Sequence, residues 1–211
     1  MPNQTYASIS WDDGKEIRIY HLGPGNILQE YAYSESKGRN SWHYGDLHKL
    51  GLVLDPTSSI AAVRHRDDGI SLFFQDPNDG LIRALRQSGP TGQWRNDRAE
   101  GARAVKGSSI AVVMDDDGLA RYRLYYQDPG LYLRERYYIP NATHWPFGDF
   151  HPGVQPRGTP ITAEVVLGGD VYLNVMWRNS QGRAVVSSWS AASGWEMPNS
   201  NGGGTTLDGR D

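Results

Sequence analysis

The stretch RLYYQDPGLYLRERYY, residues 123–138, contains two strand-like runs joined by an Asp-Pro-Gly turn. A similar stretch, RIYHLGPGNILQEYAY, occupies residues 18–33. In both stretches an Arg precedes a Glu by twelve residues, as Arg18 and Glu30 in the first and as Arg123 and Glu135 in the second. A charge pair that recurs inside recurring strands indicates a repeated structural unit.

The whole sequence contains four copies of this unit. Isoleucines in short apolar runs recur at spacings of 51, 50 and 51 residues, at Ile9, Ile60, Ile110 and Ile161. Tryptophans at the other end of each unit recur at spacings of 52, 51 and 50 residues, at Trp42, Trp94, Trp145 and Trp195. Two more strand-like runs lie between these markers, separated by turns rich in Gly, Pro, Asp and Asn. Each unit therefore predicts three clear strands and a weaker fourth strand around its Trp.

A period of about 50 residues with four strands per unit is typical of a β-propeller blade. We predict an all-β fold, a propeller domain over residues 1–198, with four-stranded blades at about 5–48, 57–98, 107–150 and 159–198. Residues 199–211, rich in Gly, are expected to form a flexible tail. Four blades could close a ring alone or form part of a ring that another chain completes. A β-sandwich is the alternative fold, but it does not explain the period.

The Arg and Glu pair is present in units 1 and 3 only. Aligning the strands places Ser71 and Ala84 at these positions in unit 2, and Asn174 and Val186 in unit 4. An ion pair that the whole fold needs for stability would recur in all four units. Its presence in alternate units therefore favours binding sites. The structural alternative is a cross-strand ion pair on a solvated sheet face, worth about 0–1 kcal/mol.

An Arg and a Glu on adjacent strands, beside aromatic rings, suit a carbohydrate ligand. Sugar hydroxyls hydrogen-bond to charged donors and acceptors in fixed positions, and sugar C–H faces pack on flat rings. The chain has 7 Trp and 12 Tyr but only 4 Phe, so most of its aromatic side chains are amphipathic. This composition is common at surfaces that are partly apolar and partly wet.

The sequence resembles the fungal fucose-specific lectins over about residues 5–198. The resemblance rests on the segments IRIY, NILQEYAY, SWHYGDL, SSIAAV, YRLYYQD and LRERYY. It implies a β-propeller, usually of six blades, with fucose pockets between neighbouring blades. In that pattern one blade supplies an Arg and a Glu that hydrogen-bond the sugar. The next blade supplies an aromatic residue three positions after its Glu position, together with its repeat-end Trp.

The resemblance implies one complete pocket and one weaker pocket. The complete pocket combines elements of units 3 and 4, and its residues are Arg123, Glu135, Trp189 and Trp195. The weaker pocket combines units 1 and 2, and its residues are Arg18, Glu30 and Trp94, with Gln87 in place of the first aromatic. Two further aromatic pairs, Tyr33 with Trp42 and Tyr138 with Trp145, would have no charged pair beside them. We therefore expect two unequal fucose sites, of which the unit-3 site is the tighter.

These observations predict a lectin that binds fucosylated glycans without catalysis, cofactor or metal. A glycosidase needs two carboxyl groups with separate roles, whereas each Glu here has an Arg that would hold it ionised. The net charge of −3 and the lack of a basic patch argue against nucleic acid as a partner. A protein-interaction propeller with decayed sugar sites and a glycosidase-like propeller remain the alternatives.

Other sequence features concern location and assembly. No cysteine is present, and no apolar segment is long enough to span a membrane. The segment MPNQTYASIS lacks the features of a secretory signal, so we expect a cytoplasmic location, with non-classical secretion as the alternative. The six His lack metal-site spacing, and the acidic runs WDDG and MDDDG are interpreted as turns rather than calcium loops. Assembly into a homo-oligomer is left open.

Overall fold

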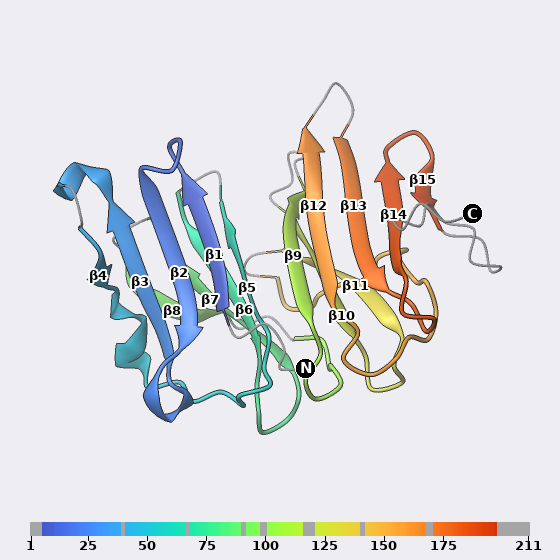
Figure 1. The fold of residues 1–211 in the computed structure, drawn as a ribbon, viewed down its shortest axis with the longest axis horizontal. Coiled ribbons are helices and arrows are strands. Elements are labelled where there is room, and N and C mark those ends of the chain that lie inside the picture. Colours follow the sequence, from blue (N-terminus) through green and yellow to red (C-terminus); the bar gives the residue numbers. More distant parts are fainter. Residues whose placement is uncertain are drawn as a thin grey trace.

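The computed structural model describes residues 6–38, 41–65, 68–89, 92–97, 101–115, 121–139, 142–167 and 171–197. These residues form four antiparallel sheets, each made of strands that are consecutive in the chain (Figure 1). The helical segments in the described residues are three short 3-10 turns, Pro24–Asn26, Glu35–Lys37 and Asp46–Leu50. The predicted all-β class and the four repeated blades are confirmed. The predicted tail, residues 199–211, lies outside the described residues.

Three of the blades have four strands each. Blade 1 contains β1 (Tyr6–Trp11), β2 (Glu16–Leu22), β3 (Leu28–Ser34) and β4 (His43–Tyr44). Blade 2 contains β5 (Ile60–Arg64), β6 (Ile70–Gln75), β7 (Ile82–Gln87) and β8 (Trp94–Asp97). Blade 4 contains β12 (Ile161–Leu167), β13 (Val171–Arg178), β14 (Ala184–Ser190) and β15 (Gly194–Glu196). The strands within each blade follow the predicted repeat.

Blade 3 differs from the expected four strands. Its sheet contains β9 (Ile110–Asp115), β10 (Arg121–Gln127) and β11 (Leu133–Tyr138). The segment that would form the fourth strand meets β11 through an isolated bridge between Arg136 and Phe147, and Pro146 accepts a hydrogen bond from the Tyr137 amide at 2.9 Å. Pro146 has no N–H to donate, so the ladder cannot continue through it.

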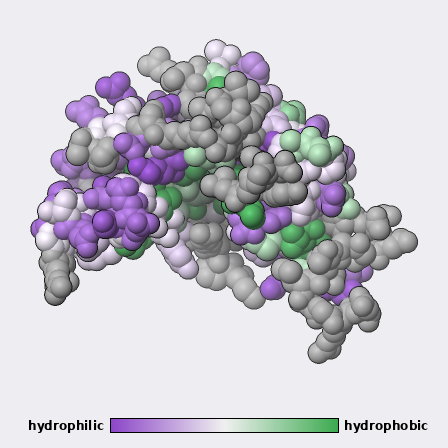
Figure 2. Space-filling model, turned by 90° about the horizontal axis from the view of Figure 1, so that it is seen from above, coloured by the Kyte–Doolittle hydropathy of each residue, from purple (hydrophilic) through white to green (hydrophobic). Residues whose placement is uncertain are grey.

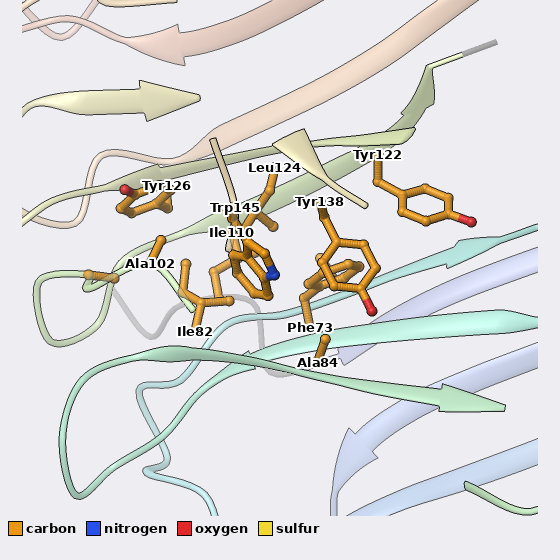
Figure 3. Close-up of a cluster of buried hydrophobic side chains, with 12 residues drawn as sticks. Phe73, Ile82, Ala84, Ala102, Ile110, Tyr122, Leu124, Tyr126, Tyr138 and Trp145 are labelled. Atoms are coloured by element: carbon orange, nitrogen blue, oxygen red, sulfur yellow. The ribbon is translucent and has the colours of Figure 1, made fainter. Parts of the chain in front are cut away.

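The hydrophobic core lies between blades rather than within them. The buried apolar residues form three clusters, which draw mainly on blades 1 and 2, blades 2 and 3, and blades 3 and 4. Figure 3 shows the middle cluster, in which Phe73 and Ile82 of blade 2 meet Tyr138 and Trp145 of blade 3. The central strand β6 of blade 2 is buried along its whole length, because blade 2 has a neighbour on both faces, whereas β3 of the terminal blade 1 alternates buried and half-buried side chains.

The strands that carry Ile9, Ile60, Ile110 and Ile161 form the inner edges of the blades. Contacts join β1 to β5, β5 to β9, and β9 to β12. The serines of the SSI motifs link these strands: the Ile110 amide donates to Ser59 Oγ at 3.2 Å, and the Ile161 amide donates to Ser109 Oγ at 3.1 Å. No comparable contact joins β12 to β1 within the described residues. The blades form an open arc, which Figure 2 shows from above as an arch.

Two buried glutamines link consecutive blades: Gln75 links blade 2 to blade 3, and Gln127 links blade 3 to blade 4. Gln127 Nε2 donates to the carbonyls of Leu131, Gln155 and Pro156 at 3.1, 2.9 and 3.0 Å, and its Oε1 accepts from the Gly158 amide at 2.9 Å. Gln75 makes the same pattern one unit earlier, to the loop that leads into blade 3. Each glutamine therefore links the end of the second strand of its blade to the entry of the next blade.

The substitution Gln127→Leu tests this link. It leaves buried carbonyl groups without a donor, and each such group costs about 1–3 kcal/mol. We expect the free energy of unfolding to fall by about 2–4 kcal/mol in chemical denaturation. The matched control is Gln93→Leu, because Gln93 is exposed. Equal unfolding midpoints for the two variants would contradict a structural role for Gln127.

Candidate functional site

The two predicted charge pairs lie at blade seams and are buried. We call Arg18 with Glu30 the unit-1 fork, and Arg123 with Glu135 the unit-3 fork. Arg and Glu are diagonal neighbours on adjacent strands, because Tyr125 is directly opposite Glu135 in the ladder and Arg123 is two residues away. Arg123 Nη1 lies 3.0 Å from Glu135 Oε1, and Arg18 Nε lies 3.6 Å from Glu30 Oε1. All four side chains are at most 7% exposed, which rules out an ion pair on a solvated face.

The unit-3 fork brings together all four residues predicted for it. The Glu135 Oε1 atom accepts from Arg123 Nη1 at 3.0 Å and from Tyr125 Oη at 2.8 Å. The Glu135 Oε2 atom accepts from the Phe150 amide at 3.2 Å and from Trp195 Nε1, which belongs to blade 4, at 3.3 Å. Trp189, also in blade 4, places its ring centroid 4.3 Å from the Arg123 guanidinium carbon. The carboxylate is thus satisfied by donors from two blades.

The unit-1 fork repeats the interblade bond with fewer donors. Trp94 of blade 2 donates its Nε1 to Glu30 Oε2 at 3.2 Å. Its ring is 7% exposed and packs edge-on against Tyr20, so Trp94 acts mainly by holding the carboxylate. The hydroxyl of Tyr20 is buried and has no hydrogen-bond partner, unlike that of Tyr125. Arg18 Nη1 donates to the Tyr33 carbonyl at 3.1 Å, which fixes the guanidinium.

Burial at the seams changes the pKa of Glu30 and of the tyrosines beside both forks. Burial raises the pKa of Glu30, and the hydrogen bond from Trp94 and the charge of Arg18 offset this effect only in part. Burial raises the pKa of Tyr20 and of Tyr125 well above the ordinary value, so both phenols stay protonated at neutral pH. Glu30 is therefore the group of the unit-1 fork that acidification changes first.

A cavity of about 580 Å³ opens beside the unit-1 fork. Arg18 and Glu30 of blade 1 line it on one side, and Arg64 and Gln87 of blade 2 line it on the other. The fork thus faces a space between two blades. In the described part of the chain, no cluster of three or more His, Cys, Asp or Glu residues is placed to bind a metal ion.

The seam between blades 2 and 3 is filled by protein. Tyr138 and Trp145 are 0% and 3% exposed and pack against Phe73, with the Phe73 and Tyr138 centroids 5.0 Å apart (Figure 3). The Tyr138 hydroxyl donates to Asp97. Ala84, which replaces the Glu, is 2% exposed within the same cluster. Without a fork, the aromatic residues of this seam have become core residues.

The other predicted positions have different surroundings. Tyr33 and Trp42 lie at the free end of the arc, with ring centroids 5.4 Å apart, and Trp42 is 45% exposed. Asn174 accepts from Ser188 Oγ at 2.8 Å and donates to Glu164 Oε1 at 3.3 Å on β12, while Val186 on β14 occupies the position of the fork Glu.

Two further positions accompany the forks, and the sequence interpretation missed both. Tyr20 and Tyr125 follow the fork Arg by two residues, whereas units 2 and 4 have Phe73 and Met176 there. A glycine follows the repeat-end Trp by three residues only in units 1 and 3. The equivalent residues of the four units are Gly45, Asp97, Gly148 and Pro198. Comparison of the four units could have found both signals.

The two glycines make room for the fork carboxylates. A Cβ atom added to Gly45 would lie 2.1 Å from Glu30 Oε2, and one added to Gly148 would lie 2.0 Å from Glu135 Oε2. Gly45 has a φ of −79°, which any residue can adopt, so the requirement is for space rather than for backbone freedom. The fork therefore depends on a residue from the outer part of its own blade.

Paired substitutions at the two tyrosines test the difference between the forks. Tyr125→Phe removes a donor from a buried carboxylate and should lower the free energy of unfolding by about 1–3 kcal/mol. Tyr20→Phe removes a buried hydroxyl that has no partner and should be neutral or stabilising. Urea unfolding of both variants measures the difference. Equal losses of stability would contradict the hydrogen-bond assignment.

Comparison with known proteins supports the resemblance to the fungal fucose-specific lectins. A sequence model described as "Fungal fucose-specific lectin" matches residues 4–201. The "Fucose-specific lectin" of Aleuria aurantia is 26% identical over 199 residues, covering 91% of this chain and 59% of the relative. The "Fucose-specific lectin" of Aspergillus fumigatus is 28% identical over 190 residues, covering 86% and 58%. The chain thus spans about three-fifths of the length of these curated relatives.

Solved structures share the fold. AofleA from Arthrobotrys oligospora superposes with a TM-score of 0.78 at 21% identity, over 93% of this chain and 57% of that one. SapL1 lectin in complex with alpha methyl fucoside superposes with a TM-score of 0.76 at 20% identity, over 94% and 63%. A variant of the Aleuria aurantia lectin in complex with alpha-methyl-L-fucoside gives a TM-score of 0.71 at 21% identity, over 91% and 59%. Because the family match covers residues 4–201, the chain belongs to the fungal fucose-specific lectin family.

Proposed function

We propose that this chain is a lectin that binds fucose-containing glycans, without catalysis, at the seams between blades 1 and 2 and between blades 3 and 4. The observation that carries the proposal is the fork itself. At both seams a buried Arg and Glu meet, and the repeat-end Trp of the next blade donates to the carboxylate. The middle seam lacks the charged pair and is packed with aromatic side chains.

The chemistry of the fork suits a sugar. A guanidinium has five N–H donors, and a carboxylate has about four lone-pair positions. Glu30 accepts from Trp94 and keeps lone pairs for ligand hydroxyls. Glu135 already accepts from four donors, so a sugar hydroxyl at the unit-3 seam would replace one of them. Trp189 and Trp195 supply flat rings beside the unit-3 fork, and such rings pack on sugar C–H faces. The relatives named above are described as fucose-specific lectins, and two of the solved structures contain fucosides.

The absence of catalysis in this proposal follows from the roles of the carboxylates. Glycoside hydrolysis uses a protonated carboxyl group and an ionised one on either side of the bond. In the unit-3 fork, a single carboxylate accepts hydrogen bonds from Arg123, Tyr125 and Trp195. An acceptor held in this way is suited to binding a hydroxyl rather than to donating a proton. Incubation with an aryl fucoside should accordingly give no product.

Calorimetry with methyl α-L-fucoside tests the two-site proposal. We expect a stoichiometry between one and two, and the double substitution Arg18→Ala with Arg123→Ala should abolish binding. Glu135→Ala alone should weaken the unit-3 site about tenfold or more, because it removes the acceptor of the fork. Glu164→Ala is the matched control, since Glu164 is exposed and pairs with Asn174 in a blade without a fork. A stoichiometry of four, or binding that survives the double substitution, would contradict the proposal.

The raised pKa of Glu30 predicts pH dependence at the unit-1 site. The fork needs ionised Glu30, so affinity is fully present above the pKa of Glu30 and is lost as the pH falls through it. Because that pKa is raised, the loss should begin above the range of an ordinary Glu, whose pKa is about 4.3. Titrations of the Glu135→Ala variant across acidic pH isolate this site, and Glu30→Gln should give a flat profile. A midpoint at or below the ordinary value would contradict the assignment.

A further inference from the structure

Each described seam is fastened by an entry segment, a short stretch that precedes the inner strand of the next blade. The three entry segments, residues 52–54, 102–104 and 153–155, each meet the loop before the third strand of the preceding blade. At the seam between blades 3 and 4, the Leu133 amide donates to the Gly153 carbonyl at 3.3 Å, and the Gln155 amide donates to the Leu131 carbonyl at 3.0 Å. The same two bonds recur at the other two seams, at 2.8 to 3.0 Å. Docking of an entry segment is therefore part of the repeat.

Blade 4 presents the same backbone groups to whatever follows it. In each earlier blade, the carbonyl that accepts the entry segment belongs to a residue in the left-handed region, which residues other than Gly rarely adopt. These residues are Asn26, Gly80 and Leu131, with φ values of 59°, 71° and 67°. Ala184 lies opposite Arg178 as Leu133 lies opposite Gln127, so the equivalent residue of blade 4 is Gly182, with a φ of 78°. A fourth entry segment would therefore bind the Gly182 carbonyl and the Ala184 amide.

A cavity of about 690 Å³ lies beside these groups. Thr162, Met176 and Ala184 line it on the face of blade 4 that points away from blade 3. The residues that alternate with them belong to the cluster between blades 3 and 4, and they are Ile161, Val175 and Val185. One blade earlier, the equivalent place is filled by the entry segment that Gln127 holds through the carbonyls of Gln155 and Pro156. The cavity thus has the position and the lining of a groove for an entry segment.

The sequence after blade 4 has the spacing of an entry segment. Trp94 and Trp145, the repeat-end residues of blades 2 and 3, each precede the entry segment of the next blade by eight residues. Eight residues after Trp195, the stretch GGTTLDGRD begins, residues 203–211. The chain itself therefore contains a candidate occupant for the cavity.

The order of residues in this stretch also matches the earlier units. LDG at 207–209 repeats the order of an apolar residue, a charged residue and Gly that follows the earlier entry segments as VKG at 105–107 and PRG at 156–158. The apolar residue of the first of these triplets, Val105, is 5% exposed. Leu207 has the equivalent place in its triplet, so we expect it to be the residue that the groove buries.

The charges have changed on both sides of this contact. Asp208 takes the place of the cations Lys106 and Arg157 of the earlier units. On blade 4, Arg178 takes the place of Gln127, and it lines the cavity. A guanidinium donates to carbonyl groups as the glutamine amide does, and it also forms strong hydrogen bonds with a carboxylate. The two replacements therefore complement each other.

We propose that residues 203–209 act as a fourth entry segment, which docks in the cavity of blade 4. The segment pairs with the Gly182 carbonyl and the Ala184 amide, Leu207 enters the groove, and Asp208 pairs with Arg178. Its role is to cover the outer face of the last blade, in place of the flexible tail that its glycines predict. This inference concerns the fold and does not depend on the proposed binding of sugar.

Thiol accessibility tests the proposal, because the chain contains no Cys. A chromogenic thiol reagent is added to the folded Leu207→Cys chain and to the matched Ser200→Cys chain, whose thiol lies before the segment. We expect the thiol at position 207 to react about tenfold more slowly or less, since the segment must leave the groove before the reagent reaches it. In urea the two thiols should react at the same rate. Equal rates in the folded chains would overturn the proposal.

A charge exchange tests the placement of the segment. Arg178→Glu in the Leu207→Cys chain should bring the rate to within about twofold of the Ser200→Cys chain, and adding Asp208→Arg should restore the protection. Arg95→Glu, at an exposed position of blade 2, is the matched control and should leave the protection unchanged. Protection that survives Arg178→Glu would contradict the placement. Protection that disappears on dilution would show that a second copy fills the cavity, and would overturn the proposal.

Hydrogen exchange of the unaltered chain gives a reading that no substitution can disturb. The Ala184 amide should exchange slowly, as the equivalent amides of Ile82 and Leu133 should. Leu207→Asp should speed the exchange of Ala184 about tenfold and leave that of Leu133 unchanged. Fast exchange of Ala184 in the unaltered chain would overturn the proposal.

Discussion

The hydrogen bond from the repeat-end Trp of one blade to the Glu of the preceding blade is the interaction on which the sites depend. A buried carboxylate is costly unless donors surround it. Glu135 obtains donors from Arg123, Tyr125 and the Phe150 amide in its own unit and from Trp195 in the next blade. Docking of the next blade therefore completes the set of donors. The site is a property of the seam and not of either blade.

The seams between blades differ in whether they contain a buried charged pair that needs hydrogen-bond donors. Where Arg and Glu are present, the seam keeps a charged fork, and the unit-1 fork faces a cavity. Where Ser71 and Ala84 replace them, nothing opposes the burial of Tyr138 and Trp145, and the seam closes into a hydrophobic core. Closure of the middle seam adds apolar burial, which stabilises by about 25 cal/mol per Å². All three seams contain a buried apolar cluster, and the two fork seams carry a charged pair in addition.

The sequence predicted more about the blades than about their contacts. The regular spacing of Ile9, Ile60, Ile110 and Ile161 was sufficient for four blades, since each unit is a local meander. The loss of Arg and Glu together in units 2 and 4 was sufficient to locate the forks. The sequence left a closed ring and a partial ring as alternatives, because curvature depends on the angle at which successive sheets pack, and the repeat count does not specify that angle. The three-stranded sheet of blade 3 could have been anticipated from Pro146, which interrupts the expected fourth strand.

The side chains around the forks were the hardest to predict, because their roles depend on packing between blades. Trp94 was expected as a sugar-binding ring, and the structure places it nearly buried, with its N–H on Glu30. Trp11 approaches Arg18 from a strand that carries no fork residue, so alignment of the units gave no signal for it. The most direct measurement is a crystal structure of the chain soaked with methyl α-L-fucoside. We expect sugar at both forks, with hydroxyls within about 3 Å of the Glu30 and Glu135 carboxylates. Sugar bound only away from both carboxylates, for example beside Tyr33 and Trp42, would contradict it.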